Sequence, residues 1–287
     1  MIPDPGELDA IINRALAEDA VGSDATSLSL IPPNLEATAS LVTKQPGILA
    51  GIHIADAVFK RVNPDLKFVC RLQDGDRLAV GKTLATVSGS IASILSGERT
   101  ALNFLQRMSG IATLTDLYVS AVEGTNASIV DTRKTVPGLR RLDKYSVHIG
   151  GGRNHRMNLS DGVLIKDNHI AALRSTGNTL EQLIKQARST APHTLKIEVE
   201  VESVEGAISA ASAGADIVML DNMHSDDMRS AVAKIFPDQC IVEASGGITL
   251  ANVAEVASTG VDFISIGALT HSPMALDISL DYHTKIT

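Results

Sequence analysis

The second part of the chain repeats one pattern, in which a short apolar run is followed by a stretch with apolar residues at helical spacing. Such short runs are typical of parallel strands that are buried on both faces. The six runs are residues 128–130, 163–165, 197–201, 217–220, 241–242 and 263–266. Most of them are separated by amphipathic stretches, at residues 179–188, 204–213, 225–236 and 250–258. The alternation predicts βα units, whose crossovers should be right-handed.

The number of strands decides which parallel α/β fold to expect. A closed α/β barrel has about eight strands, whereas this pattern supplies six. We therefore predict an α/β fold with an open or incomplete parallel α/β barrel. A doubly wound parallel sheet is the alternative, because it is built from the same βα units.

The first part of the chain is less regular. A helix is expected near residues 8–18, and apolar residues return at helical spacing over residues 97–123. Between these helices the apolar and polar residues alternate as in strands, at residues 37–43, 66–72 and 83–87. We expect an α+β domain over residues 1–110 and the barrel over residues 111–270, with the long helix leading from one to the other.

The composition narrows the possible functions. Hydrophobic residues make up 44% of the chain, which is enough for a sizeable core. A net charge of −8 and only 3% aromatic residues argue against binding to nucleic acid, which favours basic patches and stacking rings. The two cysteines lie too far apart in sequence for a metal knuckle and are too few for a disulfide scaffold. With no signal peptide and no apolar run of membrane length, we expect a cytoplasmic protein with no membrane partner.

Cationic residues are concentrated in one segment near the predicted strand ends. Residues 133–174 contain nine Lys or Arg against three acids, in a chain that is acidic as a whole. Such a concentration focuses a positive potential on a small anionic ligand. Arg133, Lys134 and Lys166 directly follow predicted strands, where the working residues of parallel α/β folds gather. Four of the other cationic residues are interpreted as solvated surface residues, and these are Arg140, Arg141, Lys144 and Arg174.

Acidic residues also occur within and after the predicted strands. Residues 196–202 alternate strictly, so Lys196 and three glutamates share one face. On an edge strand this would be the wet side, but in a barrel it would direct acids into the lumen, where they need cationic partners. Because Asp221 ends the next strand, we interpret Glu200 as functional, while Glu198 and Glu202 remain unassigned.

Two small-residue turns end the last two predicted strands. Ser245, Gly246 and Gly247 follow one strand and open a helix, and Gly267 follows the other. Backbone N–H groups at such turns can hold a phosphate, and glycine lets the backbone approach it closely. Ordinary tight turns would explain either one alone. The pair in the final two units favours a phosphate site.

Three longer motifs overlap these strand ends. They read DTRKTVPGLR at residues 131–140, GGGRNHRMNLSD at residues 150–161 and IKDNH at residues 165–169. All three closely resemble motifs of quinolinate phosphoribosyltransferases. The likeness continues at residues 98–103, 198–201, 220–222, 243–248 and 265–267.

The resemblance implies the fold and the oligomeric assembly that are typical of type II phosphoribosyltransferases. The implied fold is an N-terminal α/β sandwich domain, rejoined by the tail 271–287, with an open α/β barrel of fewer than eight strands. The implied partner is a second copy of the chain, in a homodimer or an assembly of dimers. Arg99 would then be supplied to the active site across the interface between subunits.

The resemblance also implies an activity, which is phosphoribosyl transfer from phosphoribosyl pyrophosphate to quinolinate. Pyrophosphate and CO₂ are released and nicotinate mononucleotide remains, as in de novo NAD biosynthesis. The implied quinolinate ligands are Arg99, Thr132, Arg133, His155, Arg156 and Lys166. The residues implied to face phosphoribosyl pyrophosphate are Lys134, Glu200 and Asp221, with Ser245, Gly246, Gly247, Ile266, Gly267 and Ala268 around the 5-phosphate. Mg²⁺ is expected as the cofactor, held mainly by the pyrophosphate, so that no direct metal ligand is assigned.

Three other functions fit part of the pattern. A paralogous phosphoribosyltransferase could act on a different acid, as in the relative associated with molybdenum uptake, although the 131–140 motif and the His155–Arg156 pair weigh against this. A phosphate-binding barrel isomerase or synthase would need the turn at Ser245 but not so many arginines. A non-catalytic anion-binding module is the third alternative.

Overall fold

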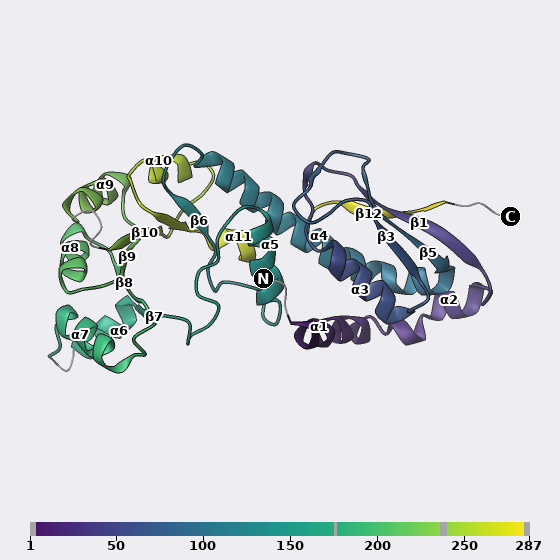
Figure 1. Ribbon diagram of the computed structural model, residues 1–287, viewed down its shortest axis with the longest axis horizontal. Coiled ribbons are helices and arrows are strands. Elements are labelled where there is room, and N and C mark those ends of the chain that lie inside the picture. The colour runs from purple at the N-terminus through teal and green to yellow at the C-terminus, as the bar shows by residue number, and fades with distance from the viewer. Residues whose placement is uncertain (1–3, 175–176, 236–239, 284–287) are drawn as a thin grey trace. The chain divides into compact units, whose positions relative to one another are not determined.

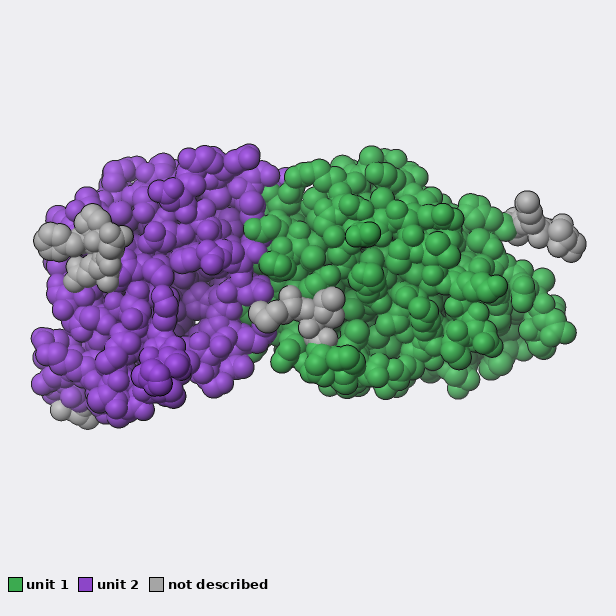
Figure 2. Space-filling view, viewed as in Figure 1, with its two compact units in different colours: residues 1–116, 135–151, 269–287 green, residues 117–134, 152–268 purple. Residues whose placement is uncertain are grey.

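The chain forms two compact units in the computed structural model, which describes residues 4–174, 177–235 and 240–283 (Figure 2). Unit 1 comprises residues 1–116, 135–151 and 269–287. Unit 2 comprises residues 117–134 and 152–268. Each unit is therefore assembled from separate segments of sequence.

Unit 1 contains a four-stranded antiparallel sheet (Figure 1). Across the sheet the strands are β12 (Ile278–His283), β1 (Glu36–Thr43), β5 (Thr83–Ser90) and β3 (Lys67–Cys70). Two short strands, β2 (Gly47–Ile48) and β4 (Arg77–Leu78), pair separately. The helices are α1 (Pro5–Glu18), the 3₁₀ turn η1 (Val21–Ser23), α2 (Ala25–Leu30), α3 (Ile52–Val62), most of α4 (Ile91–Ala121), α5 (Arg140–Ile149) and nearly all of α11 (Ala268–His271).

The core of unit 1 joins its sheet to its helices. Leu41 of β1, Phe59 of α3 and Leu105 of α4 are fully buried in one apolar cluster. The C-terminal strand β12 adds Ile278 to the same cluster, so the end of the chain completes a sheet that begins near its start. The expected N-terminal α/β sandwich is confirmed.

Helix α4 runs without interruption through Ser109-Gly110. Gly110 is required there because a Cβ atom would lie 2.1 Å from the carbonyl oxygen of Met274. The side chain of Ser109 is also buried, and its hydroxyl accepts a hydrogen bond from the Ala50 N–H at 3.0 Å. These two small residues therefore let neighbouring backbone pack closely against the helix.

Unit 2 contains a six-stranded parallel sheet (Figure 1). Across the sheet the strands are β6 (Ser128–Val130), β11 (Phe263–Ser265), β10 (Ile241–Ser245), β9 (Ile217–Asp221), β8 (Ile197–Val201) and β7 (Val163–Ile165). The helices are α6 (Asp167–Arg174), α7 (Leu180–Thr190), α8 (Val204–Ser212), α9 (Ser225–Lys234) and α10 (Val253–Ala257). Strands β6 and β7 are the two ends of this order, so within the described residues the sheet does not close.

The open parallel α/β barrel predicted from the sequence is thus confirmed, and all six predicted strands are present. The helix limits differ by a few residues; for example, α10 begins at Val253 instead of residue 250. Parallel pairing brings the carboxyl ends of all six strands to one edge of the sheet. None of the described helices is long and apolar enough to cross a membrane.

Two details differ from the sequence interpretation. The structural division falls after residue 116, compared with residue 110 in the sequence prediction, and residues 135–151 belong to unit 1. Lys144 was expected on the surface, but its side chain is fully buried within α5. Helix α5 buries consecutive positions from Leu142 to Val147, so Lys144 is enclosed together with its neighbours. The side chain of Arg174 lies outside the described residues.

Candidate active site

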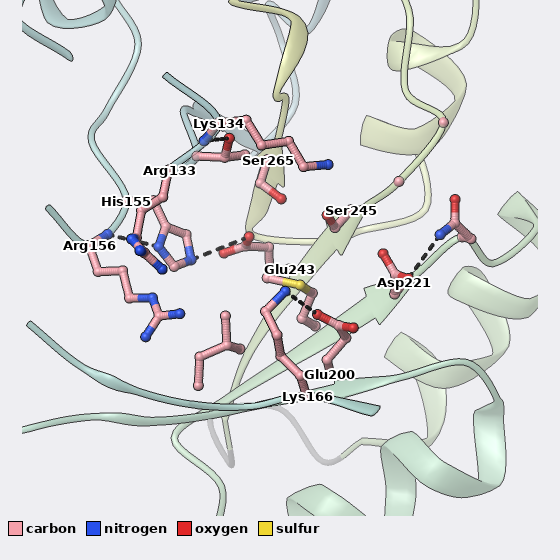
Figure 3. Close-up of a pocket in the computed structure, with 16 residues that line it drawn as sticks. Arg133, Lys134, His155, Arg156, Lys166, Glu200, Asp221, Glu243, Ser245 and Ser265 are labelled. Carbon is pink, nitrogen blue, oxygen red and sulfur yellow. Dashed lines mark hydrogen bonds and ion pairs between the residues drawn. The ribbon is translucent and has the colours of Figure 1, made fainter. Parts of the chain in front are cut away.

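A pocket of about 570 Å³ opens at the carboxyl ends of the parallel strands of unit 2 (Figure 3). All six strands, or the residues directly after them, contribute to its wall. The lining residues are Thr132, Arg133, Lys134, His155, Arg156, Leu164, Lys166, Glu200, Met219, Asp221, Asn222, Glu243, Ser245, Gly246, Gly247 and Ser265.

One side of the pocket is cationic. Arg133 and Arg156 lie there on different loops, and burial lowers the pKa of Arg156, with the neighbouring Arg133 charge adding to the effect and Glu198 opposing it. The Nε atom of Arg133 is buried and has no hydrogen-bond partner within the described residues. Two partly desolvated guanidiniums therefore face a space that an anion with several oxygens could fill.

Asp131 fixes the loop that brings His155 and Arg156 into the pocket. This residue follows β6 and is fully buried. Its carboxylate accepts hydrogen bonds from the side chain of Asn154 at 2.7 Å and from the backbone N–H of His155 at 2.9 Å. The backbone of Arg153 also pairs with Ile129 and Asp131. Residues 153–156 are thereby held along the end of a strand that precedes them by more than twenty positions.

His155 lies against two buried glutamates. Its Nε2 atom is 3.2 Å from a carboxylate oxygen of Glu198 and 3.6 Å from one of Glu243. Its Nδ1 atom accepts a hydrogen bond from the backbone N–H of Arg156 at 2.8 Å. Burial raises the pKa of Glu243 to about 7, and the charge of Glu198 adds to this effect.

Glu243 was not among the site residues predicted from the sequence, and Glu198 had no predicted role. Glu198 is the second residue of β8, and Glu243 is the third residue of β10. An acid inside an otherwise apolar strand was a signal for Glu243. Nothing in the spacing could show that both side chains point at His155, because the three residues lie on three separate segments.

The opposite side of the pocket carries a salt bridge and a further carboxylate, that of Asp221. Lys166 Nζ lies 3.2 Å from a carboxylate oxygen of Glu200. Asp221, at the end of β9, accepts a hydrogen bond from the side chain of Asn222 at 2.8 Å. Asn222 adopts a left-handed backbone conformation, with φ of 53°, and its N–H donates to the Ser245 carbonyl oxygen at 2.9 Å. These contacts join the ends of β9 and β10.

The turn after β10 completes the wall of the pocket. Gly246 and Gly247 both have positive φ, at 86° and 63°. A Cβ atom on Gly246 would lie 2.4 Å from the side-chain oxygen of Asn222. Glycine is needed at this position for both the conformation and the close approach. The turn therefore exposes its backbone directly to the pocket.

Most of the site residues predicted from the sequence line this one pocket. They are Thr132, Arg133, Lys134, His155, Arg156, Lys166, Glu200, Asp221, Ser245, Gly246 and Gly247. Ile266, Gly267 and Ala268 do not line it, although they follow Ser265, which does. Arg99 is an exposed residue of α4 in unit 1, where it lines a separate hollow with Arg14 and Arg107.

Comparisons with known proteins identify the family. A family model for the C-terminal domain of quinolinate phosphoribosyl transferase matches residues 111–281, and one for the N-terminal domain matches residues 24–109. The chain belongs to the quinolinate phosphoribosyltransferase family. This assignment agrees with the motifs at residues 131–140, 150–161 and 165–169.

Relatives within the family match almost the full chain. The probable nicotinate-nucleotide pyrophosphorylase (carboxylating) of Bacillus subtilis is 44% identical, over 96% of this chain and 93% of the relative. The nicotinate-nucleotide pyrophosphorylase (carboxylating) of Mycobacterium leprae is 43% identical, over 94% of this chain and 95% of the relative. The crystal structure of NadC from Streptococcus pyogenes is 39% identical with a TM-score of 0.93, covering 99% of this chain and all of that one.

Proposed function

We propose that this chain transfers the phosphoribosyl group of phosphoribosyl pyrophosphate to quinolinate and removes one carboxylate as CO₂. The products are nicotinate mononucleotide, pyrophosphate and CO₂, as in NAD biosynthesis. The observation that best supports this activity is one pocket that combines two partly desolvated arginines with a glycine turn open to the backbone. The family and its named members support the same reaction.

Quinolinate would occupy the cationic side. It carries two adjacent carboxylates, and guanidinium groups can hold such carboxylates by paired hydrogen bonds that also orient the ring. Arg133 and Arg156 supply these groups, and the buried Nε of Arg133 still has a hydrogen bond to make. Thr132 and His155 also line this pocket, and Lys166 would approach the ligand from the opposite side. Orienting the ring directs its nitrogen toward the ribose.

Phosphoribosyl pyrophosphate would occupy the side with the glycine turn. Backbone N–H groups at Ser245, Gly246 and Gly247 are suited to the 5-phosphate, with residues 266–268 after the adjoining strand. Cleavage of the bond between ribose and pyrophosphate builds positive charge at the anomeric carbon, which Glu200 and Asp221 would stabilise. Negative charge builds on the leaving pyrophosphate, which Lys134 would stabilise.

Mg²⁺ is the proposed cofactor, and the pocket chemistry is compatible with it. Glu200 already pairs with Lys166, which leaves Asp221 as the carboxylate with no cation bound to it in the described residues. Mg²⁺ favours oxygen ligands and commonly keeps waters while it binds to one or two carboxylates and to substrate phosphates. Asp221 would hold the ion together with pyrophosphate oxygens. When bound, the ion supplies charge neutralisation for the leaving group.

The decarboxylation needs no organic cofactor. Once the ring nitrogen is bonded to ribose it is cationic, so the ring can accept the electron pair left when the adjacent C–CO₂ bond breaks. A proton then adds to that ring carbon. The carboxylate that leaves is the one on the ring carbon bonded to that nitrogen, and the arginines orient the ring that carries it.

The active enzyme would be a homodimer, or an assembly of dimers, in the cytoplasm. Arg99 is exposed on unit 1 and does not line the pocket of unit 2. In the dimer it would reach the pocket of the partner subunit and add a further cation for quinolinate.

The purified protein should be assayed with quinolinate, phosphoribosyl pyrophosphate and Mg²⁺. We expect release of pyrophosphate and CO₂ in equal amounts, and no CO₂ release when nicotinate replaces quinolinate. Turnover with another acid, and none with quinolinate, would indicate the paralogous transferase instead. Binding of both reactants without any turnover would indicate an anion-binding module.

A further inference from the structure

The surroundings of His155 favour one tautomer of its ring. Its Nδ1 atom accepts a hydrogen bond from the backbone N–H of Arg156 at 2.8 Å, so a proton on Nδ1 would face another donor. This contact favours a ring proton on Nε2 alone, which is the neutral form of the imidazole. Nε2 lies next to a carboxylate oxygen of Glu198 and points toward Glu243, as Figure 3 shows for Glu243.

Two carboxylates thus compete for one donor. Glu198 takes the shorter contact, at 3.2 Å, and Glu243 lies at 3.6 Å. The nearest oxygens of the two glutamates are within 4.8 Å of each other, and both side chains are almost fully buried. Oε1 of Glu243 has no hydrogen-bond partner in the described residues. Two buried carboxylates this close cannot both ionise without a large repulsion.

We propose that Glu198 and Glu243 share one proton and together hold His155 as a neutral Nε2–H imidazole, which preserves the positive charge of the quinolinate end. Glu243 is a positioning residue in this arrangement, since it acts through His155 and Glu198. The predicted effect on quinolinate binding rests on the proposed function, whereas the shared proton itself does not.

The charges around Glu243 explain why the proton is needed. The ionisable groups that face it are Glu198 on β8, His155 on the adjoining loop and Asp131 after β6. Glu198 and Asp131 both raise the pKa of Glu243, a hydrogen bond with Ser265 lowers it, and a positive charge on His155 would lower it as well. If Glu243 were ionised as well, its charge would offset one of the two guanidiniums that attract the quinolinate carboxylates. Burial alone already favours the protonated form.

The first test compares quinolinate binding in the wild type and in Glu243→Gln over a pH range centred on neutrality. Glutamine keeps the shape of the neutral acid but cannot ionise. We expect the wild-type KM for quinolinate to rise relative to that of Glu243→Gln as the pH increases beyond about 7, by roughly tenfold, while kcat stays within a few-fold. A constant ratio of the two KM values across the range would overturn the proposal. Loss of kcat in Glu243→Gln would also overturn it, by making Glu243 a proton donor in the reaction.

Matched variants separate the carboxyl pair from general effects. Glu198→Gln should also flatten the pH dependence of the KM. When residue 198 cannot ionise, the pair beside His155 holds at most one negative charge, so the second ionisation that weakens quinolinate binding is lost. Glu202→Gln changes an exposed glutamate near the end of the same strand and should retain the wild-type profile. If Glu202→Gln flattened the profile as strongly, the effect would not belong to the buried pair.

A spectroscopic test does not depend on turnover. Nitrogen NMR of labelled imidazoles should show His155 as the neutral Nε2–H tautomer, identified by its absence in His155→Gln. The infrared spectrum should contain a protonated carboxyl band that disappears in Glu243→Gln. An imidazolium at neutral pH, or no such band, would overturn the proposal even in an active enzyme. If the protein did not turn over quinolinate, these two signals would still decide on the shared proton.

The same three side chains could instead bind a metal ion, since their ligand atoms lie within 4.8 Å of one another. Calorimetric titration with Zn²⁺ tests this. We expect the wild type and Glu243→Gln to give the same titration, so that no Zn²⁺ binding depends on Glu243. Stoichiometric binding that Glu243→Gln and His155→Gln both abolish would make the cluster a metal site and would overturn the shared proton.

Discussion

Individual charged residues in this protein are placed where burial makes them costly. Arg133 has a buried Nε without a partner in the described residues, and burial lowers the pKa of Arg156. Asp131 is fully buried but satisfies its carboxylate with two hydrogen bonds that hold the His155 loop. The acid is thus used to build the pocket, whereas the arginines are left to interact with a ligand.

Removing either arginine should weaken quinolinate binding. Arg133→Ala and Arg156→Ala are each expected to raise the KM for quinolinate at least about tenfold, because a carboxylate loses a charge-assisted hydrogen bond in a partly desolvated site. Steady-state kinetics with quinolinate as the varied substrate would measure this. Arg229→Ala is the control, because Arg229 is exposed and pairs with the surface residue Asp226. An unchanged KM in both pocket variants would contradict the carboxylate clamp.

Glu243 should also make stability depend on pH. Its pKa of about 7 in the folded protein is above the ordinary value of 4.5, so the folded state binds the extra proton. The stability this adds is fully present below pH 4.5 and is lost as the pH rises toward about 7. The wild type should therefore lose stability relative to Glu243→Gln across this interval and remain constant relative to it above. Denaturant unfolding at a series of pH values measures the difference, and an opposite slope would mean that Glu243 is ionised.

The turn after β10 shows how an element shapes the pocket. It is short because Gly246 and Gly247 accept positive φ, and it is close to β9 because Gly246 has no side chain to meet Asn222. Asn222 in turn hydrogen bonds to Asp221 and to the backbone of Ser245. A phosphate-binding turn and a candidate catalytic carboxylate are therefore one connected structure.

Replacing Gly246 by alanine should disturb this structure in two ways, by straining the backbone and by a steric clash with Asn222. Gly246→Ala is expected to raise the KM for phosphoribosyl pyrophosphate by roughly tenfold or more, because Cβ would displace Asn222. Gly214→Ala is a matched control: Gly214 has φ of 90°, but no atom lies within 4 Å of its would-be Cβ. Both variants should lose about 1 kcal/mol or more of stability from strain. If Gly214→Ala impaired the KM equally, the contact with Asn222 would not be the cause.

At the scale of the whole molecule, the candidate site residues are divided between two units. All residues that line the pocket belong to unit 2, whereas Arg99 belongs to unit 1. The chain supplies unit 1 from both of its ends and from residues 135–151, so the motif at residues 131–140 spans the division. The first residues of this motif thus contribute to the pocket in unit 2, and its last residues belong to unit 1.

Shared active sites can be tested by mixing inactive subunits. Arg99→Ala and Glu200→Gln should each be poorly active as homodimers. Subunits mixed at random in equal amounts should regain roughly a quarter of the wild-type activity, since half of the dimers are mixed and each has one intact site. Activity would be measured after subunit exchange, with heterodimers confirmed by two affinity tags. No recovery in confirmed heterodimers would show that Arg99 acts within its own subunit or not at all.

The sequence by itself determined the parts of the protein that follow from local pattern. Apolar runs of the right length predicted all six parallel strands, because burial on both faces leaves a recognisable continuous signal. The sequence also predicted that residues at the ends of those strands, such as Arg133, Lys166 and Asp221, lie at one edge of the sheet, since parallel strands all end on the same side. The glycine pair after β10 was equally readable, because few residues tolerate its conformation.

Only the tertiary structure decided which distant residues meet. His155, Glu198 and Glu243 come from three segments, and their grouping depends on strand order and on the loop held by Asp131. The burial of Lys144 and the assignment of residues 135–151 to unit 1 likewise depend on packing. Periodicity reports which face of an element is buried, but not what it is buried against. The partners of a buried charge, and therefore its protonation, are set by contacts that the sequence order does not contain.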